Sequence, residues 1–216
     1  MNKVRTHSKF ENTEIIRISV SNLVSDINGK LIGIINKEGL KRGQKNVSLA
    51  GGKALLFNRK IIESLGGFDF EKDEACFRIA EEKSSEAISL FTVRDPSLYE
   101  IDVNRELKQE FAEEIIGNMS EPILSPDECD QLTTDYRGVS FYDGYGMTEA
   151  REIITKYVWH LFSLNGPDPI MKKLQANKMV HIIENEDLLI GKTSDGFRIA
   201  QNTYNAKALL IESKNK

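Results

Sequence analysis

Residues 105–115 carry apolar and acidic side chains at a spacing that only a helix sorts onto separate faces. At 100° per residue, Leu107, Phe111 and Ile115 form an apolar stripe, and Asn104 suits the N-cap position. The neighbouring arc holds four side chains with carboxylate or amide oxygens, namely Glu106, Gln109, Glu110 and Glu113. One face of this predicted helix therefore packs into a core, and the adjacent face gathers oxygen ligands.

The spacing of the three glutamates is compatible with two interpretations. Acidic side chains at i and i+4 repel each other by about 0.3 kcal/mol per pair in an isolated helix. A cation bound among them removes that repulsion, and oxygen ligands of this kind suit Mg²⁺ or Mn²⁺. The same spacing is also typical of a solvated helix face, so the spacing by itself leaves both interpretations open.

Ahead of this helix, the chain has the alternation and the turn residues of β-strands. Residues 15–24 are rich in β-branched side chains, and the turn sequence 26–30 separates them from a second apolar run at 31–35. This pattern predicts a β-hairpin. A short predicted strand at 47–49 then runs into Gly51-Gly52, a pair that lets backbone approach closely. Further strands are predicted at 153–164 and 180–183, and further helices at 81–91 and 202–212. Both periodicities together indicate a mixed α/β fold.

The length and the composition favour a single domain. With 216 residues and 40% hydrophobic content, the chain can bury one sizeable core. We therefore expect one domain over residues 1–216, with a polar N-terminal tail at 1–14. Residues 54–102 are expected to form an inserted subregion, because a segment of that length makes a marginal core alone.

Charge, cysteine content and hydropathy disfavour several classes of function. The formal net charge of −4 provides no general attraction to duplex nucleic acid. Cys76 and Cys129 lie far apart and outside any CxxC or Cys/His cluster, which disfavours both zinc and disulfides. No segment approaches the run of about 18 apolar residues that a membrane span needs. We therefore expect a cytoplasmic protein.

Residues 105–110, Arg-Glu-Leu-Lys-Gln-Glu, resemble the second half of the Nudix box, Arg-Glu-(apolar)-x-Glu-Glu. The predicted hairpin followed by Ser48-Leu49-Ala50-Gly51-Gly52 is similar to the family's order of hairpin, loop and Leu-Pro-Gly-Gly. Two features depart from the family. Residues 53–104 separate the two motifs where the box has a short spacing, and Gln109 stands where the family usually has a metal-binding glutamate. An amide oxygen binds a cation with less negative charge than a carboxylate.

The resemblance implies a Nudix-type α/β/α sandwich with a mixed sheet and a long insertion between the glycine turn and the acidic helix. It also implies a site for Mg²⁺ or Mn²⁺, with Glu106 and Glu110 as catalytic metal ligands. Glu113 and Gln109 are further candidate ligands, and Arg105 would orient a glutamate. The candidate substrate-binding residues are Gly51, Gly52, Lys53 and Tyr142.

Lys53 could neutralise phosphate charge. Three further signals have both a functional and a structural interpretation. Residues 141–146, which include Tyr142, are predicted as an aromatic, glycine-rich loop that either stacks on a base or is a surface turn. Gly191-Lys192-Thr193 echoes the end of a P-loop but lacks its earlier glycine, which favours a turn. His160 and His181 lie in apolar strands and are expected to be structural.

The insertion resembles one Nudix subgroup, the domains encoded beside bacterial second-messenger nucleotide synthases in anti-phage operons, through residues 66–75 and 78–79. Outside the insertion, residues 105–107 followed by Glu113-Glu114 and residues 193–196 fit the same subgroup. This implies metal-dependent hydrolysis of a nucleoside diphosphate linked to another moiety. The alternative is a degenerate Nudix domain that binds a nucleotide signal or a protein partner, with Gln109 as the sign of lost chemistry. A third interpretation is an interaction module with a homodimer surface in the insertion. Its apolar candidates are Leu55, Leu56, Phe57 and Phe91.

Overall fold

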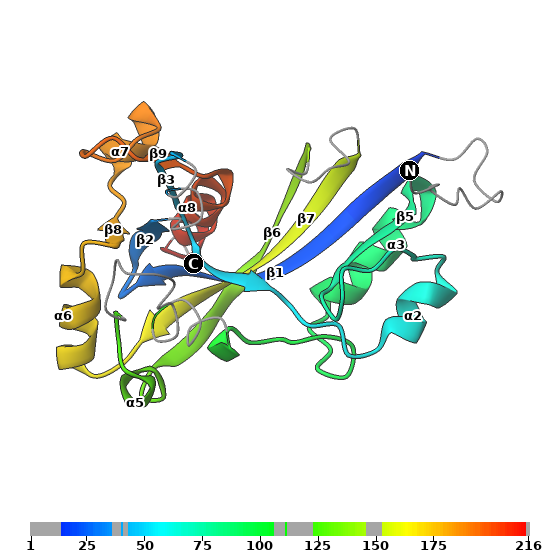
Figure 1. Cartoon of the computed structure of the whole chain (residues 1–216), viewed down its shortest axis with the longest axis horizontal. Helices are drawn as coiled ribbons and strands as arrows, with labels where there is room; N and C mark the ends of the chain where they lie inside the picture. Colours follow the sequence, from blue (N-terminus) through cyan, green and yellow to red (C-terminus); the bar gives the residue numbers. More distant parts are fainter. Residues whose placement is uncertain are drawn as a thin grey trace. The chain divides into compact units, whose positions relative to one another are not determined.

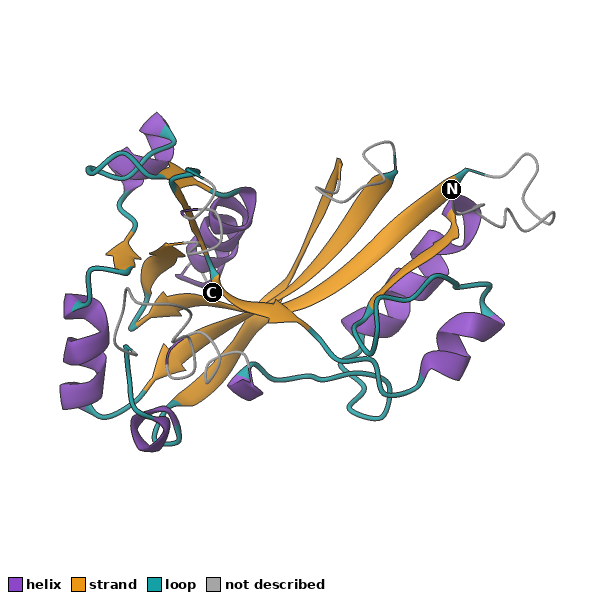
Figure 2. Cartoon of the chain, in the orientation of Figure 1, coloured by secondary structure: helices purple, strands orange, loops and turns teal. Residues whose placement is uncertain are grey.

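A computed structural model describes residues 14–35, 40, 43–105, 111, 123–145 and 153–214. These residues form a mixed α/β fold of strands and helices (Figures 1 and 2). They group into two compact units. Unit 1 comprises Met1–Val20, Lys53–Ile101 and Tyr142–Val158, and unit 2 comprises Ser21–Gly52, Asp102–Phe141 and Trp159–Lys216. The expectation of a single domain stays a prediction.

The predicted β-hairpin is present. Strand β1 (Ile15–Ile27) pairs with β2 (Lys30–Ile35) antiparallel, with Asp26 opposite Leu31. The turn between them places Asn28 at φ 51° and Gly29 at φ 74°, the left-handed conformations that a two-residue hairpin turn requires. β1 extends beyond the predicted strand, because buried side chains continue up to the turn.

Among the described residues, nine strands belong to the sheet, in which the main path runs β6-β7-β1-β2-β3-β9. The remaining strands β4 and β5 pair with β1, and β8 pairs with β2. The further strand bounds are Asn46–Ser48 (β3), Ala50–Lys53 (β4), Cys76–Ala80 (β5), Thr133–Tyr145 (β6), Ile154–Asn165 (β7), Val180–Ile182 (β8) and Arg198–Ile199 (β9). β3 and β9 are parallel, whereas β1 is antiparallel to β2 and β5, so the sheet is mixed.

The helices lie at Arg59–Ser64 (α2), Glu81–Thr92 (α3), Pro126–Cys129 (α5), Asp168–Ala176 (α6), Asn185–Ile190 (α7) and Gln201–Lys214 (α8). The predicted helices 81–91 and 202–212 are confirmed as α3 and α8, and the predicted strands 153–164 and 180–183 as β7 and β8. No described helix is both long and apolar enough to cross a membrane.

The core of unit 2 brings together residues from widely separated segments. Val24, Ile27 and Ile32 come from the hairpin, and Leu174 comes from α6. Phe111 is 1% exposed and belongs to the same apolar cluster. Phe111 is the middle residue of the apolar stripe predicted from the helical spacing, so its burial agrees with that part of the prediction.

Unit 1 has a smaller aromatic core. The ring of Phe91 lies 6.1 Å from that of Phe77 and 5.1 Å from that of Tyr99, between centroids. The Tyr99 hydroxyl donates a hydrogen bond to the Phe91 carbonyl oxygen at 2.6 Å. Phe91 and Leu56 are both buried. Among the four apolar candidates for a homodimer surface, only Phe57 is well exposed, at 58%.

Candidate functional site

The predicted metal site falls mostly on residues that the structure does not describe. Glu106, Gln109, Glu110 and Glu113 lie outside the described residues. Arg105 is helical, as is Asn104, whose backbone N–H donates to Asp102 Oδ1 at 3.1 Å. Asn104 is thus the start of the helix rather than its N-cap. Among the described residues, no group of three or more His, Cys, Asp or Glu could hold a metal ion.

The two halves of the interrupted motif nevertheless belong to one unit. The chain contributes Ser21–Gly52 to unit 2, adds Lys53–Ile101 to unit 1, and continues in unit 2 from Asp102. Ala50, Val103 and Phe111 all belong to the apolar cluster of unit 2. The glycine pair lies in strand β4 and not in a turn. Its neighbour Ala50 shares a hydrophobic core with Val103 and Phe111, although about 50 residues separate Ala50 from Val103 in the chain.

Gly51 has a structural reason for being glycine. Its φ is +131°, and a Cβ atom at this position would lie 2.2 Å from the carbonyl oxygen of Asn22 and 3.0 Å from the Cα of Leu23. The missing side chain thus allows β4 to approach the backbone of β1. Contact of Gly51 and Gly52 with a substrate stays a prediction.

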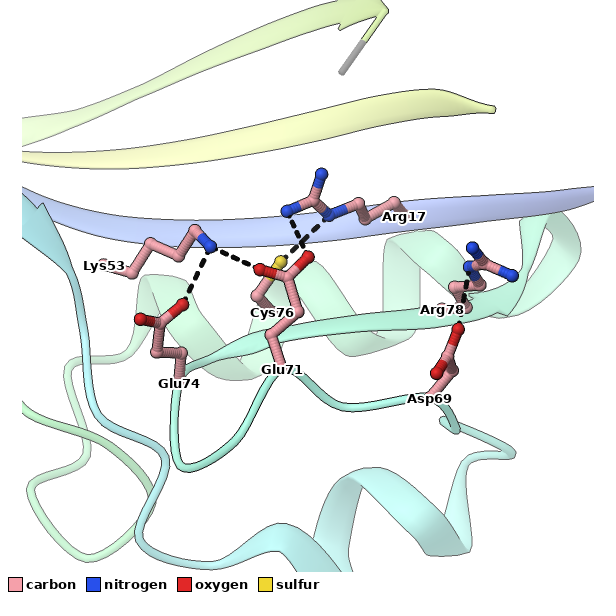
Figure 3. Close-up of polar contacts among 7 residues, drawn as sticks. All are labelled: Arg17, Lys53, Asp69, Glu71, Glu74, Cys76 and Arg78. Carbon is pink, nitrogen blue, oxygen red and sulfur yellow. Dashed lines mark hydrogen bonds and ion pairs between the residues drawn. The ribbon is translucent and has the colours of Figure 1, made fainter. Parts of the chain in front are cut away.

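Lys53 is part of an ion-pair network in unit 1 (Figure 3). Its Nζ lies 2.8 Å from Glu74 Oε2 and also pairs with Glu71 Oε2. Glu71 pairs through its other oxygen with Arg17 of β1. The Nε of Arg17 donates to the Cys76 sulfur at 3.0 Å. The ammonium group that was predicted to neutralise phosphate is therefore compensated by two carboxylates of the chain itself.

Burial and the contacts of the network shift the pKa values of Glu71, Lys53 and Cys76. Burial opposes the charged form of Glu71, but the hydrogen bond from Lys53 and the charge of Arg17 outweigh it and lower the pKa of Glu71. Burial likewise opposes charge on Lys53, yet hydrogen bonds to Glu71 and Glu74 raise the pKa of Lys53. Burial raises the pKa of the Cys76 thiol despite the neighbouring Arg17. Cys76 is therefore a poor candidate for a nucleophile.

Acid should weaken unit 1 through Glu71. Because the pKa of Glu71 is lower in the folded protein than its ordinary value of 4.5, its contribution to stability is present above pH 4.5 and is lost as the pH falls through the folded pKa. We expect Glu71→Gln to lower the melting temperature at pH 7, with a difference from the wild type that narrows below pH 4.5. Circular dichroism melts between pH 7 and pH 3 measure this, with the exposed Glu82→Gln on α3 as the control. A difference that stays constant with pH would contradict the assignment.

Tyr142 lies in a strand and not in the predicted loop. Residues 141–145 complete β6, so the loop prediction for this stretch is wrong. Exposed and half-buried residues alternate over 141–144, as they do along an extended strand. The Tyr142 ring lies beside that of Tyr157 on β7, with centroids 6.1 Å apart. It also covers Gly144, where an added Cβ would lie 2.6 Å from the Tyr142 ring. Stacking of Tyr142 on a base stays a prediction.

The two strand histidines have protein contacts, as their positions predicted. His160 is 1% exposed, and its Nδ1 lies 3.3 Å from the Tyr136 hydroxyl. His181 Nδ1 lies 3.8 Å from Asp195 Oδ1. Gly191 ends α7 in the left-handed conformation, which confirms the predicted turn at 191–193.

A second polar cluster was not anticipated from the sequence. The carboxylate of Asp26 is fully buried in unit 2 and accepts hydrogen bonds from Ser163 Oγ at 2.7 Å, Ser25 Oγ at 3.0 Å and the Gly29 backbone N–H at 3.0 Å. The Nε of Arg137 lies 3.7 Å from the same carboxylate. The spacing of Asp26 and Gly29 is a local turn signal, but nothing in the sequence connects Asp26 with Ser163. The cluster holds the hairpin turn against β7.

Comparison with known proteins found no matching protein-family model, no matching curated protein and no matching solved structure. The Nudix resemblance thus rests on the motifs in the sequence.

Proposed function

We propose that this protein is a Nudix-type, metal-dependent hydrolase of a nucleoside diphosphate linked to another moiety, acting in the cytoplasm in bacterial anti-phage nucleotide signalling. One observation supports the proposal most. Ala50, beside the glycine pair, and Val103 and Phe111, which flank the first acidic residues, belong to one hydrophobic cluster. A Nudix-type site needs its glycine segment close to its acidic helix, and the shared cluster supports that arrangement despite the long insertion.

In the proposed site, Glu106 and Glu110 would hold Mg²⁺ or Mn²⁺, with Glu113 and Gln109 as further oxygen ligands. The burial of Phe111 supports this ligand set, because a helix that packs Phe111 turns its glutamate arc to an adjacent face. A bound cation would polarise a phosphate and lower the pKa of an attacking water. Arg105 would orient a glutamate, and the backbone of Gly51-Gly52 would face the substrate.

A binding domain without catalysis is the second candidate function. Gln109 in place of a glutamate lowers the negative charge of the proposed cation site. In addition, Lys53 forms ion pairs with Glu71 and Glu74, so its charge is less available to bind a diphosphate. Such a domain would recognise a nucleotide signal or a protein partner.

The deciding experiment is calorimetric titration of Mg²⁺ and Mn²⁺ into the wild type and into Glu106→Gln/Glu110→Gln. Release of nucleotide from a panel of diphosphate-linked compounds is assayed on the same samples. Glu82→Gln/Glu86→Gln is the matched control, since it removes two exposed carboxylates at the same i, i+4 spacing on α3. Loss of both metal binding and turnover in the first variant alone supports the hydrolase. A wild type that binds no metal refutes the hydrolase and favours the binding domain.

A further inference from the structure

The residue that follows the glycine pair is tied to the insertion. Lys53 comes directly after Gly51-Gly52 and is the last residue of β4. Its ammonium group pairs with Glu71 and Glu74, and both of these belong to the predicted insertion 54–102. Figure 3 shows the Lys53 side chain directed at both carboxylates. The side chain is only 33% exposed, so the pairs are partly sheltered from solvent.

The described ion pairs of this network join cations to carboxylates. Arg17 and Lys53 supply the cations, and Glu71 and Glu74 supply the carboxylates. Glu71 joins the two cations, since one of its oxygens pairs with Arg17 and the other with Lys53. A phosphate that approached Lys53 would therefore meet an ammonium group whose charge two adjacent carboxylates already compensate.

We infer that Lys53 is a positioning residue: Glu71 and Glu74 hold its ammonium group and thereby fix the chain immediately after Gly51-Gly52. Pairing of β4 with β1 restrains the backbone of the two glycines, which have no side chains of their own, and Lys53 adds the first side-chain anchor beyond them. A small displacement of a substrate-binding segment is enough to slow a reaction strongly. The effect on turnover rests on the proposed function, whereas the coupling of Lys53 to its two carboxylates does not.

Thermal unfolding tests the coupling without any substrate. The proteins compared are the wild type, Lys53→Gln, Glu71→Gln/Glu74→Gln and the triple variant. We expect Lys53→Gln and Glu71→Gln/Glu74→Gln each to lower the melting temperature by about 2–4 °C. The triple variant should melt close to the double variant, because the double variant has already removed the ion pairs of Lys53 with Glu71 and Glu74. Lys53→Arg should restore most of the loss, and Lys83→Gln, which breaks an exposed pair with Glu86 on α3, should have little effect. Additive losses overturn the inference.

Steady-state kinetics on a hydrolysed diphosphate compound separate positioning from phosphate binding. If Lys53 positions the glycine segment, Lys53→Gln and Glu71→Gln/Glu74→Gln both lower kcat by about tenfold or more, with little change in KM. If Lys53 binds phosphate, Lys53→Gln raises KM, whereas releasing Lys53 from its carboxylates lowers KM. That opposite response would overturn the inference. A wild type that hydrolyses nothing would refute the proposed function, and the melting temperatures would still decide whether Lys53 is held by its two carboxylates.

Discussion

Gly51→Ala is expected to destabilise the protein by about 3 kcal/mol or more. The alanine Cβ would lie 2.2 Å from the carbonyl oxygen of Asn22 and 3.0 Å from the Cα of Leu23, so β4 and β1 could not keep their spacing. The φ of +131° adds strain, because a residue with a side chain rarely adopts it. Backbone atoms of a paired strand cannot turn aside as the end of a flexible side chain can. The substitution should therefore disturb folding itself.

Gly196→Ala provides the matched control. Gly196 also has a positive φ, +88°, but an added Cβ there would meet nothing within 4 Å. It should therefore show only the conformational cost of about 1–2 kcal/mol for a left-handed residue. Urea unfolding followed by circular dichroism gives both free energies. Equal losses at the two positions would mean that β4 does not approach β1 as closely as the structure has it.

Asp26→Ala should cost about 3 kcal/mol of stability. The carboxylate is fully buried, and its removal leaves Ser163 Oγ and the Gly29 backbone N–H without their acceptor. Ser25 keeps an alternative, since its hydroxyl also donates to the Phe162 carbonyl oxygen at 3.1 Å. The hairpin turn would lose its anchor and Arg137 its counter-charge. Asp26→Asn should have a smaller effect, because an amide oxygen still accepts one of these hydrogen bonds.

Asp135→Ala is the control for Asp26. Asp135 also lies in unit 2, but it is exposed and accepts a single hydrogen bond, from Asn165 at 2.9 Å. Its loss should change the free energy of unfolding by less than about 0.5 kcal/mol. Chemical unfolding of the three variants beside the wild type measures the series. An Asp26→Ala protein as stable as the Asp135→Ala protein would contradict the buried hydrogen-bond cluster.

How far the sequence predicted the structure depended on how local the signal was. The hairpin was predictable, because β-branched runs flank a turn with asparagine and glycine at the two left-handed positions. The helix α3 and the burial of Phe111 followed from a period of 3.6 residues. β6 was missed, since its described residues are exposed or half-buried and the strand has no strong apolar face. The segment around Tyr142 was mistaken for a loop for the same reason.

The candidate site was predictable only in part. Lys53 was selected from its place after a glycine pair, and from the sequence alone its charge was available to phosphate. Its partners Glu71 and Glu74 lie 18 and 21 positions further along the chain, and no helical or strand periodicity connects them with Lys53. The glycine pair likewise predicted a close approach of another backbone segment to Gly51. That this segment is Asn22 and Leu23 of β1 was not predictable from the sequence.

The sequence by itself determined the hairpin, the helix α3, the helix at α8 and the acidic motif at 105–110, because each depends on side chains within a few turns or strand steps of one another. The tertiary structure alone decided that Ala50 and Phe111 share a core, that Lys53 pairs with two carboxylates and that Asp26 accepts a hydrogen bond from Ser163. These pairings depend on which distant segments the folded chain brings into contact. Contacts of this kind are set by the packing of the whole fold, so the local spacing of residues does not predict them.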